Sequence, residues 1–351
     1  MACTLPLSFA RSALAALVTT TLLACGSEAR APGATGAPGA GAGGAAESGG
    51  STGNGGGPPS NGATGGASSG GGAAGNGSAG SGGTTAASGC AAHPDAVYCN
   101  DFDDAPVGPY TEQQLRADWN EPSWNDGVAE GRVSVVDGAD AFSGNALAVR
   151  FPQGAVGPND GGAQWHLVFT EPYEELYFAY RVRFQAGFEF VRGGKLPGLT
   201  GGKDNTGCTA TRDQGWSARN MWRRNGADPA NQAYLVQYVY DVDRPENCGD
   251  NYVYDLGAPR LFVPDQWYLI EHRVVMNTPG VADGVLQGWF DGVLAVERTD
   301  VQFRDSGNGS LAITSLYFST FFGGSGADWA PTRDETVFFD DIVVSTSPIT
   351  H

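Results

Sequence analysis

The chain has 351 residues, a formal net charge of −18 and 54 glycines. Of those glycines, 25 fall within residues 26–89, a stretch that has no Val, Ile, Leu, Met, Phe, Trp or Tyr. Such a stretch cannot bury apolar surface to offset its chain entropy, so we expect it to be disordered. The glycines have no three-residue period, which excludes collagen, and the excess of acids argues against nonspecific nucleic-acid binding.

The N-terminus has the pattern of an export signal. Arg11 precedes an apolar run that ends at Ala24 and is too short to span a bilayer comfortably. The run closes with Leu-Leu-Ala followed by Cys25, which resembles the lipobox of bacterial lipoproteins, in which the cysteine is lipidated. An ordinary signal peptide, with Cys25 incidental, is the alternative.

These features divide the chain into three parts. We expect a signal peptide at 1–24, a disordered tether at 25–89 with a span of roughly 40–50 Å, and a folded domain at 90–351. The last part has 262 residues and nearly all the aromatic side chains, which is enough for one sizeable domain. The lipoprotein interpretation predicts an exported, cell-surface monomer that contacts the membrane only through its lipid anchor.

Four further cysteines lie in the folded part, Cys90, Cys99, Cys208 and Cys248. An even number in an oxidising compartment suggests two disulfides. Three pairings are possible, and we favour Cys90–Cys99 with Cys208–Cys248. The chain has no Cys-x-x-Cys motif and its histidines are scattered, so we expect neither a metal site nor a cofactor.

From Asn145 onward the sequence alternates in short segments separated by Gly, Pro and Asp. In 175–184, apolar residues at every second position predict a half-buried strand. Further strands are expected at 145–151, 164–169, 234–240, 268–276, 311–321 and 337–344. Asp291-Gly292 between apolar runs predicts a hairpin. Without a long helical period or a 40–50-residue repeat, the pattern favours an all-β fold, a two-sheet β-jelly roll or sandwich.

Positive charge is concentrated in one window of this acidic chain. Residues 185–224 contain seven bases and three acids, a local net charge of +4. Such segregation suits an anionic substrate, although arginines such as Arg223 and Arg224 could equally be paired with the excess acids. Both lysines of the chain, Lys195 and Lys203, lie in this window.

The two lysines bound a glycine-rich segment, 193–203, that we expect to form a loop or turn. Lysine is a compact point charge whose pKa the environment can move, whereas arginine stays charged. A phosphate-binding loop is excluded, because Asp204 follows Lys203 where Ser or Thr is required and the glycine spacing is wrong.

Several segments in order match a known family. They are Phe151–Gly154, Gly157–Trp165, Gly193–Leu199, Gly215–Arg223, Gln237–Asp241 and Tyr317–Gly324. Together they resemble the family-14 polysaccharide lyases, whose members cleave alginate or glucuronan on a β-jelly-roll scaffold. The resemblance covers roughly 145–345.

The resemblance implies five site residues. They are Lys195, Ser217 and Arg219, Tyr238 and Tyr240. The stretch before the tyrosines is longer than the family pattern, which makes Tyr234 a rival, and Tyr252 with Tyr254 forms another Tyr-x-Tyr pair.

These residue types fit a β-elimination on a uronate. Arg219 and Lys195 would stabilise the enolate-like transition state that forms when the C5 proton leaves. A tyrosine can be the base if neighbouring positive charge lowers its pKa from about 10. Tyr238 and Tyr240 share one strand face, so the second could bind or protonate the leaving oxygen. Lys195 as the base is the competing assignment.

Other residues have two interpretations. His166, on a predicted strand, either lines the substrate cleft or is structural. Trp216 and Trp222 either stack on sugars or lie in the core, and we take Trp216 as the candidate for substrate binding. The leading hypothesis is a surface-anchored lyase acting on an anionic polysaccharide, with a noncatalytic glycan-binding lipoprotein as the alternative. A glycosidase is less favoured, because the adjacent Asp340 and Asp341 would point to opposite strand faces.

Overall fold

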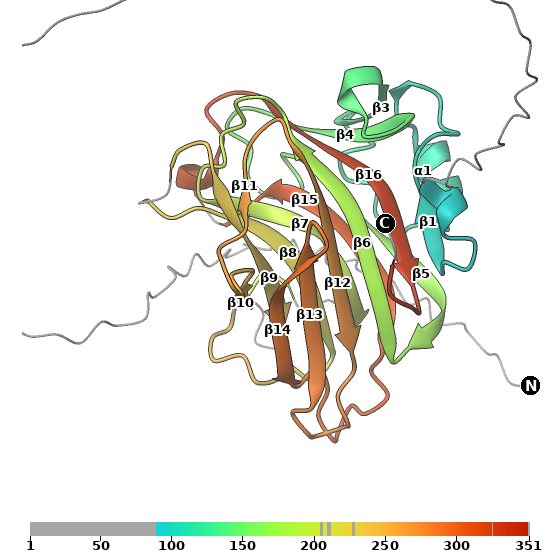
Figure 1. Ribbon diagram of the computed structural model, residues 1–351, viewed down its shortest axis with the longest axis vertical. Coiled ribbons are helices and arrows are strands. Elements are labelled where there is room, and N and C mark those ends of the chain that lie inside the picture. The colour runs from blue at the N-terminus through green and yellow to red at the C-terminus, as the bar shows by residue number, and fades with distance from the viewer. Residues whose placement is uncertain (1–88, 204–205, 209–211, 227–228, 325, 350–351) are drawn as a thin grey trace, which may run out of the picture. The chain divides into compact units, whose positions relative to one another are not determined.

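Two antiparallel β-sheets form the body of the protein in the computed structural model (Figure 1). The structure describes residues 89–203, 206–208, 212–226, 229–324 and 326–349. Residues 1–88 lie outside these ranges. They include the expected signal peptide at 1–24, Cys25 and all of the expected tether except Gly89. In the described part, no helix is long and apolar enough to cross a membrane.

The larger sheet has nine strands among the described residues. In spatial order they are β14 (Val293–Val301), β13 (Gly284–Phe290), β12 (Trp267–Val275), β6 (Glu175–Phe184), β16 (Glu335–Ser345), β4 (Asn145–Phe151), β3 (Val133–Asp137) and β2 (Gly108–Pro109), with β1 (Tyr98–Asn100) paired to β16. The predicted hairpin is confirmed, because Asp291 and Gly292, both with positive φ, connect β13 to β14.

The smaller sheet has seven strands in the same described ranges and bears the residues singled out above. In spatial order they are β10 (Asp250–Val253), β9 (Ala233–Tyr240), β8 (Gly215–Arg223), β7 (Gly193–Gly202), β15 (Ile313–Phe322) and β5 (Ala163–Tyr173), with β11 (Leu261–Phe262) paired to β9. The expectation of two packed antiparallel sheets is confirmed.

Short helices connect or flank the sheets. They are α1 (Glu112–Asp118) and the 3-10 turns η1 (Gly89–Ala92), η2 (Gly138–Asp140) and η3 (Ala327–Trp329). Thr111 caps α1: its hydroxyl accepts the Gln114 N–H, and the Gln114 side chain accepts the Thr111 N–H. Such a capping box starts a helix too short to leave a periodic signal in the sequence.

Aromatic side chains fill the space between the two sheets. Trp165 of β5 stacks on Phe318 of β15 with ring centroids 4.4 Å apart, and Trp222 of β8 packs edge-on against Phe184 of β6. Burying each such side chain contributes about 1.5–3 kcal/mol. One face of the smaller sheet is therefore covered by the core. The opposite face points away from the larger sheet.

The glycine-rich segment expected to be a loop is instead β7, a central strand, and that expectation is wrong. A Cβ on Gly194 would lie 2.0 Å from the indole of Trp222, and one on Gly201 would lie 2.6 Å from the Trp216 indole nitrogen. The glycines therefore make room for neighbouring tryptophans, which is a known use of glycine inside strands.

Both favoured disulfides are present. Cys90 is bonded to Cys99 beside η1 and β1, and Cys208 is bonded to Cys248. The second bond joins the connection between β7 and β8 to the connection between β9 and β10.

Candidate active site

A row of side chains crosses the smaller sheet on the face away from the core. Strand register places His166 of β5 opposite Tyr317 of β15, and Tyr317 opposite Gly198 of β7. Gly198 lies opposite Arg219 of β8, which lies opposite Tyr238 of β9. With strands about 4.8 Å apart, the row spans about 19 Å. Gly198 has no side chain, so Arg219 can extend toward Tyr317, whose ring centroid is 4.9 Å from the guanidinium carbon.

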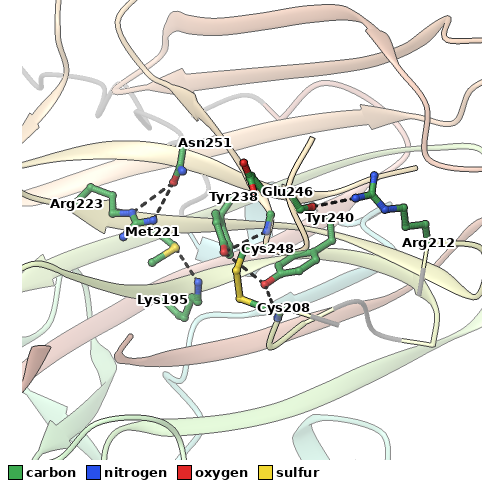
Figure 2. Close-up of a disulfide and its surroundings, with 11 residues drawn as sticks. Lys195, Cys208, Arg212, Met221, Arg223, Tyr238, Tyr240, Glu246, Cys248 and Asn251 are labelled. Carbon is green, nitrogen blue, oxygen red and sulfur yellow. Dashed lines mark hydrogen bonds between the residues drawn. A yellow bond between two sulfur atoms is a disulfide. The ribbon is translucent and has the colours of Figure 1, made fainter. Parts of the chain in front are cut away.

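A β-bulge places Lys195 beside this row. Three residue steps in β7, from Lys195 to Gly198, face two steps in β8, from Met221 to Arg219. The extra residue accommodates Pro197, which a regular central strand would not tolerate. The Lys195 ammonium lies 2.8 Å from the Met221 sulfur and 3.7 Å from the centroid of the Tyr238 ring (Figure 2).

Lys195 is buried without a carboxylate partner among the described residues. Burial lowers the pKa of its ammonium well below the usual 10.5, and the charges of Arg219 and Arg223 lower it further. In this environment the neutral amine forms at a lower pH than it does in a free lysine, so the side chain can accept a proton.

Arg219 is 2% exposed and forms no ion pair within the described part of the chain. One of its terminal nitrogens donates to the Ser319 hydroxyl at 3.2 Å, and its Nε has no partner among the described residues. A buried guanidinium with donors to spare is suited to bind a carboxylate. Ser217 lies two residues before it on the same face, opposite Tyr240 of β9.

Tyr238 and Tyr240 project together from β9, with hydroxyl oxygens 3.4 Å apart. The Gly249 N–H donates to the Tyr238 oxygen and the Cys208 N–H to the Tyr240 oxygen, each at 3.2 Å (Figure 2). Burial first, and Tyr240 second, raise the pKa of Tyr238 above its usual value near 10. The condition for a tyrosine base, a pKa lowered by neighbouring positive charge, is therefore not met at Tyr238, because desolvation outweighs the nearby Arg223.

His166 and Tyr317 form the other end of the row. Their rings are stacked with centroids 4.1 Å apart, and Trp124 packs edge-on against both. The Trp124 side chain is 41% exposed. A backbone bridge between Asp126 and Gln164 holds its segment against β5.

Several candidates lie elsewhere or play another part. Trp216 is fully buried against Phe303 between the sheets, so its assignment to substrate binding is wrong. It alternates with Ser217 and therefore faces the core. Tyr254 also points into the core, where its hydroxyl donates to Gln237, which removes the Tyr252–Tyr254 pair as a rival. Tyr234 is on the site face of β9, but opposite Arg223 rather than Arg219.

Within the described ranges, no group of three or more His, Cys, Asp or Glu side chains could hold a metal ion. The site that the structure assembles is instead a set of two basic groups, the Lys195 amine and the Arg219 guanidinium, beside two hydroxyl groups. Such a set can neutralise a substrate carboxylate and exchange protons with its neighbouring carbon and oxygen atoms.

The sequence was compared with models of known protein families. The sequence pattern of the family described as polysaccharide lyase 14 matches residues 139–342, more than half of the 351-residue chain. The protein belongs to the polysaccharide lyase 14 family. It is therefore a polysaccharide lyase, and the resemblance found from the ordered motifs is confirmed.

Solved structures of similar proteins share the fold of this polysaccharide lyase. The alginate lyase Aly36B is 23% identical, with a TM-score of 0.60 over 72% of this chain and 97% of that chain. A variant of Aly36B in complex with an alginate tetrasaccharide is also 23% identical, with a TM-score of 0.61 over 72% of this chain and 97% of that chain. The marine alginate lyase from Aplysia kurodai is 22% identical, with a TM-score of 0.55 over 69% of this chain and 96% of that chain. No curated protein matches the sequence.

Sequence reasoning missed some residues of the candidate site. Tyr317 and Ser319 lie in a segment that matched the family, and alternation along β15 could have placed both on the face of Arg219. Met221 follows Arg219 by two residues and could have been found in the same way. Trp124 could not, because it lies before the first predicted strand and reaches the site through a loop.

Proposed function

We propose that this lyase cleaves a polyuronide, such as alginate, by β-elimination. The observation that carries the proposal is the burial of Lys195 and Arg219, without carboxylate partners in the described part of the chain, directly beside the Tyr238–Tyr240 pair. A buried guanidinium that lacks a counter-ion is costly. A uronate carboxylate is an anion that would compensate Arg219, beside a lysine whose surroundings favour the neutral amine.

In this mechanism Arg219 binds the carboxylate of the sugar whose C5 proton is removed. Its free donors can form charge-assisted hydrogen bonds with the carboxylate oxygens. Those bonds strengthen as negative charge develops during proton removal, so they lower the barrier to reaction.

We assign the base to Lys195 and the acid to the tyrosine pair. The lowered pKa of Lys195 provides the neutral amine that takes the C5 proton. The raised pKa of Tyr238 keeps its hydroxyl protonated, so it can donate to the C4 oxygen as the glycosidic bond breaks. Tyr240, 3.4 Å away, can donate a hydrogen bond to the tyrosinate that Tyr238 becomes. The site resets when Lys195 loses the C5 proton to solvent and Tyr238 takes one back. These roles select the competing assignment of the sequence analysis over a tyrosine base.

The relatives support a polyuronide as the substrate class. All three similar structures named here are of alginate lyases, and the tetrasaccharide complex is of a variant in which a lysine and a tyrosine were replaced by alanine. The row from Tyr238 to His166 would provide a continuous binding surface for a polyuronide. We assign the exposed ring of Trp124 and the stacked His166–Tyr317 pair to sugar binding at its far end.

The test is incubation with alginate, polymannuronate, polyguluronate and glucuronan, with two assays run together. We expect ultraviolet absorbance from the new C4–C5 double bond, in step with new reducing ends. Reducing ends without unsaturation would identify a glycosidase. Saturable binding without either product would identify a noncatalytic binding protein, and both results would refute the proposal.

We also propose that the lyase is an exported lipoprotein anchored through Cys25. The lipobox-like run before Cys25 and the glycine-rich tract after it support this assignment. Cys25→Ser in the full chain should move the protein from the membrane fraction to the soluble exported fraction in a bacterial host. Unchanged fractionation of Cys25→Ser would contradict it.

A further inference from the structure

Two backbone amides contact the paired tyrosines from outside the strand that bears them. Cys208 N–H reaches the Tyr240 oxygen and Gly249 N–H reaches the Tyr238 oxygen, both at 3.2 Å. Figure 2 shows the Cys208–Cys248 disulfide lying directly beside both hydroxyls. Neither amide belongs to β9, so local strand geometry does not explain their positions.

The two amides come from connections that are 40 residues apart at their cysteines and are joined by that disulfide. Arg212 adds a second link between the same connections. Its guanidinium donates to the carbonyl oxygens of Val242 and Glu246, each at 3.2 Å, and to that of Arg244 (Figure 2 shows the contact with Glu246). We call the disulfide and Arg212 together the clamp.

We propose that the clamp positions the Cys208 and Gly249 amides so that the tyrosine pair can act as the general acid. This inference rests on the proposed function. An N–H that donates to a phenol oxygen occupies one lone pair, which leaves the hydroxyl proton free to point toward the substrate. The same N–H stabilises the tyrosinate that forms when the proton is given to the C4 oxygen.

In this role Cys208, Cys248 and Arg212 are positioning residues, since they act through the tyrosines and the two amides. Arg244 supports the arrangement, because its buried guanidinium lies 5.3 Å from the centroid of the Tyr240 ring. A disulfide with a merely structural role would change the stability of the fold. It would leave the ionisation of the two tyrosines unchanged.

The chain provides a matched control, since Cys90–Cys99 is a second disulfide beside β1 and apart from the site. The experiment compares Cys208→Ser/Cys248→Ser with Cys90→Ser/Cys99→Ser in the full chain on alginate. We expect the first variant to lose kcat on the order of 10- to 100-fold, with KM within about twofold of the control. Its alkaline limb of kcat should move to higher pH, because a tyrosine without its N–H donor ionises less readily.

Equal kcat and equal pH profiles in the two variants would overturn the proposal. If Cys208→Ser/Cys248→Ser fails to fold by circular dichroism, Arg212→Met decides, because it keeps both disulfides and removes the second link. We expect Arg212→Met to change in the same directions, with a lower kcat and an alkaline limb of kcat that lies at higher pH. Wild-type behaviour of that variant would equally contradict the clamp.

Failure of the proposed function gives a different result, namely no unsaturated product from the wild type or from the control. Tyrosine ionisation, followed by ultraviolet absorbance, then still tests the clamp, with Tyr238→Phe/Tyr240→Phe to identify the contribution of the pair. We expect the ionisation of the pair to shift to higher pH when the clamp is cut. An unchanged titration would refute the proposal without reference to activity.

Discussion

Lys195 combines a buried charge with cationic neighbours, and both features favour its neutral form. An ammonium gains little from the Met221 sulfur and the Tyr238 ring compared with what it loses by leaving water. Arg219 and Arg223 repel it as well. A residue so placed is poorly suited to hold the fold together and well suited to exchange a proton.

Lys195→Met should therefore reduce kcat by about 10²–10⁴-fold, the range for loss of a general base. The fold should keep its stability, because the substitution replaces a buried amine that has no carboxylate partner among the described residues with an apolar side chain of similar length. The exposed Lys203 provides the matched control, and Lys203→Met should retain full activity. Activity of Lys195→Met within tenfold of the control would rule out this base.

The pH profile follows from the same shift. The base acts in its neutral form, so a pKa lowered from 10.5 moves the rising limb of kcat/KM to lower pH. Arg223→Met removes one of the charges that lower this pKa, and we expect the rising limb to move toward higher pH. A limb that stays in place, measured on the same alginate, would show that Lys195 does not set it.

We expect Trp124 to contribute to the binding of long chains rather than to the reaction. Trp124→Ala should raise KM for polymeric alginate several-fold, because a sugar loses its aromatic contact at the far end of the row. Short oligosaccharides that reach only from Tyr238 to Arg219 should keep their kcat and KM. Phe142, also exposed but in the connection before β4, where it packs against Trp267 of β12, provides the control Phe142→Ala. An equal change in KM for short and long substrates would contradict this role.

At the scale of elements, β7 shows how a glycine-rich sequence can form a central strand. Its glycines lack side chains where Trp216 and Trp222 of the neighbouring β8 need space. The bulge at Pro197 then turns Lys195 toward the site face. One face of β7 therefore packs against the core, and the opposite face bears Lys195 of the candidate site.

Gly201→Ala should destabilise the protein by about 1–3 kcal/mol through overpacking. A Cβ there would lie 1.9 Å from the carbonyl oxygen of Ala312, whereas nothing lies within 4 Å of a Cβ at Gly226. Gly226→Ala is therefore the control, and chemical denaturation monitored by tryptophan fluorescence gives both free energies of unfolding. Equal stabilities would mean that β7 does not pack as described.

At the scale of the whole molecule, positive charge is segregated in an acidic protein. The net charge of −18 keeps polyanions away from most of the surface, while Arg219 and Arg223 lie on one sheet face. A polyanionic chain is therefore attracted to one region and repelled from the rest. We expect this charge distribution to orient a polyanionic substrate toward the site as well as to increase its affinity.

Salt should weaken that attraction. Raising NaCl from about 0.1 M to about 1 M shortens the Debye length from about 10 Å to about 3 Å. We expect KM for alginate to rise several-fold while kcat changes little, because the buried contacts in the site are screened less than the long-range field. A KM independent of salt in a steady-state assay would contradict electrostatic guidance of the substrate.

Strand alternation in the sequence predicted most of the architecture. The segments at 145–151 and 175–184 match β4 and β6 in full, because both strands have one face against the core. Ordered motifs predicted the family and, with it, Lys195, Arg219 and both tyrosines. Local patterns could not predict β7, since a strand shaped by its neighbours' side chains has no alternation of its own.

The sequence by itself determined that the chain has two antiparallel sheets, two disulfides and a family-14 lyase domain. Each of these depends on local periodicity, cysteine parity or ordered motifs. Only the tertiary structure decided that Trp216 lies in the core, that Trp124 borders the site, and that the Cys208–Cys248 bond carries amides to the tyrosines. The proposal of Lys195 as the base also depends on the tertiary structure, because the pKa of a side chain depends on its burial and on charges that only folding brings together.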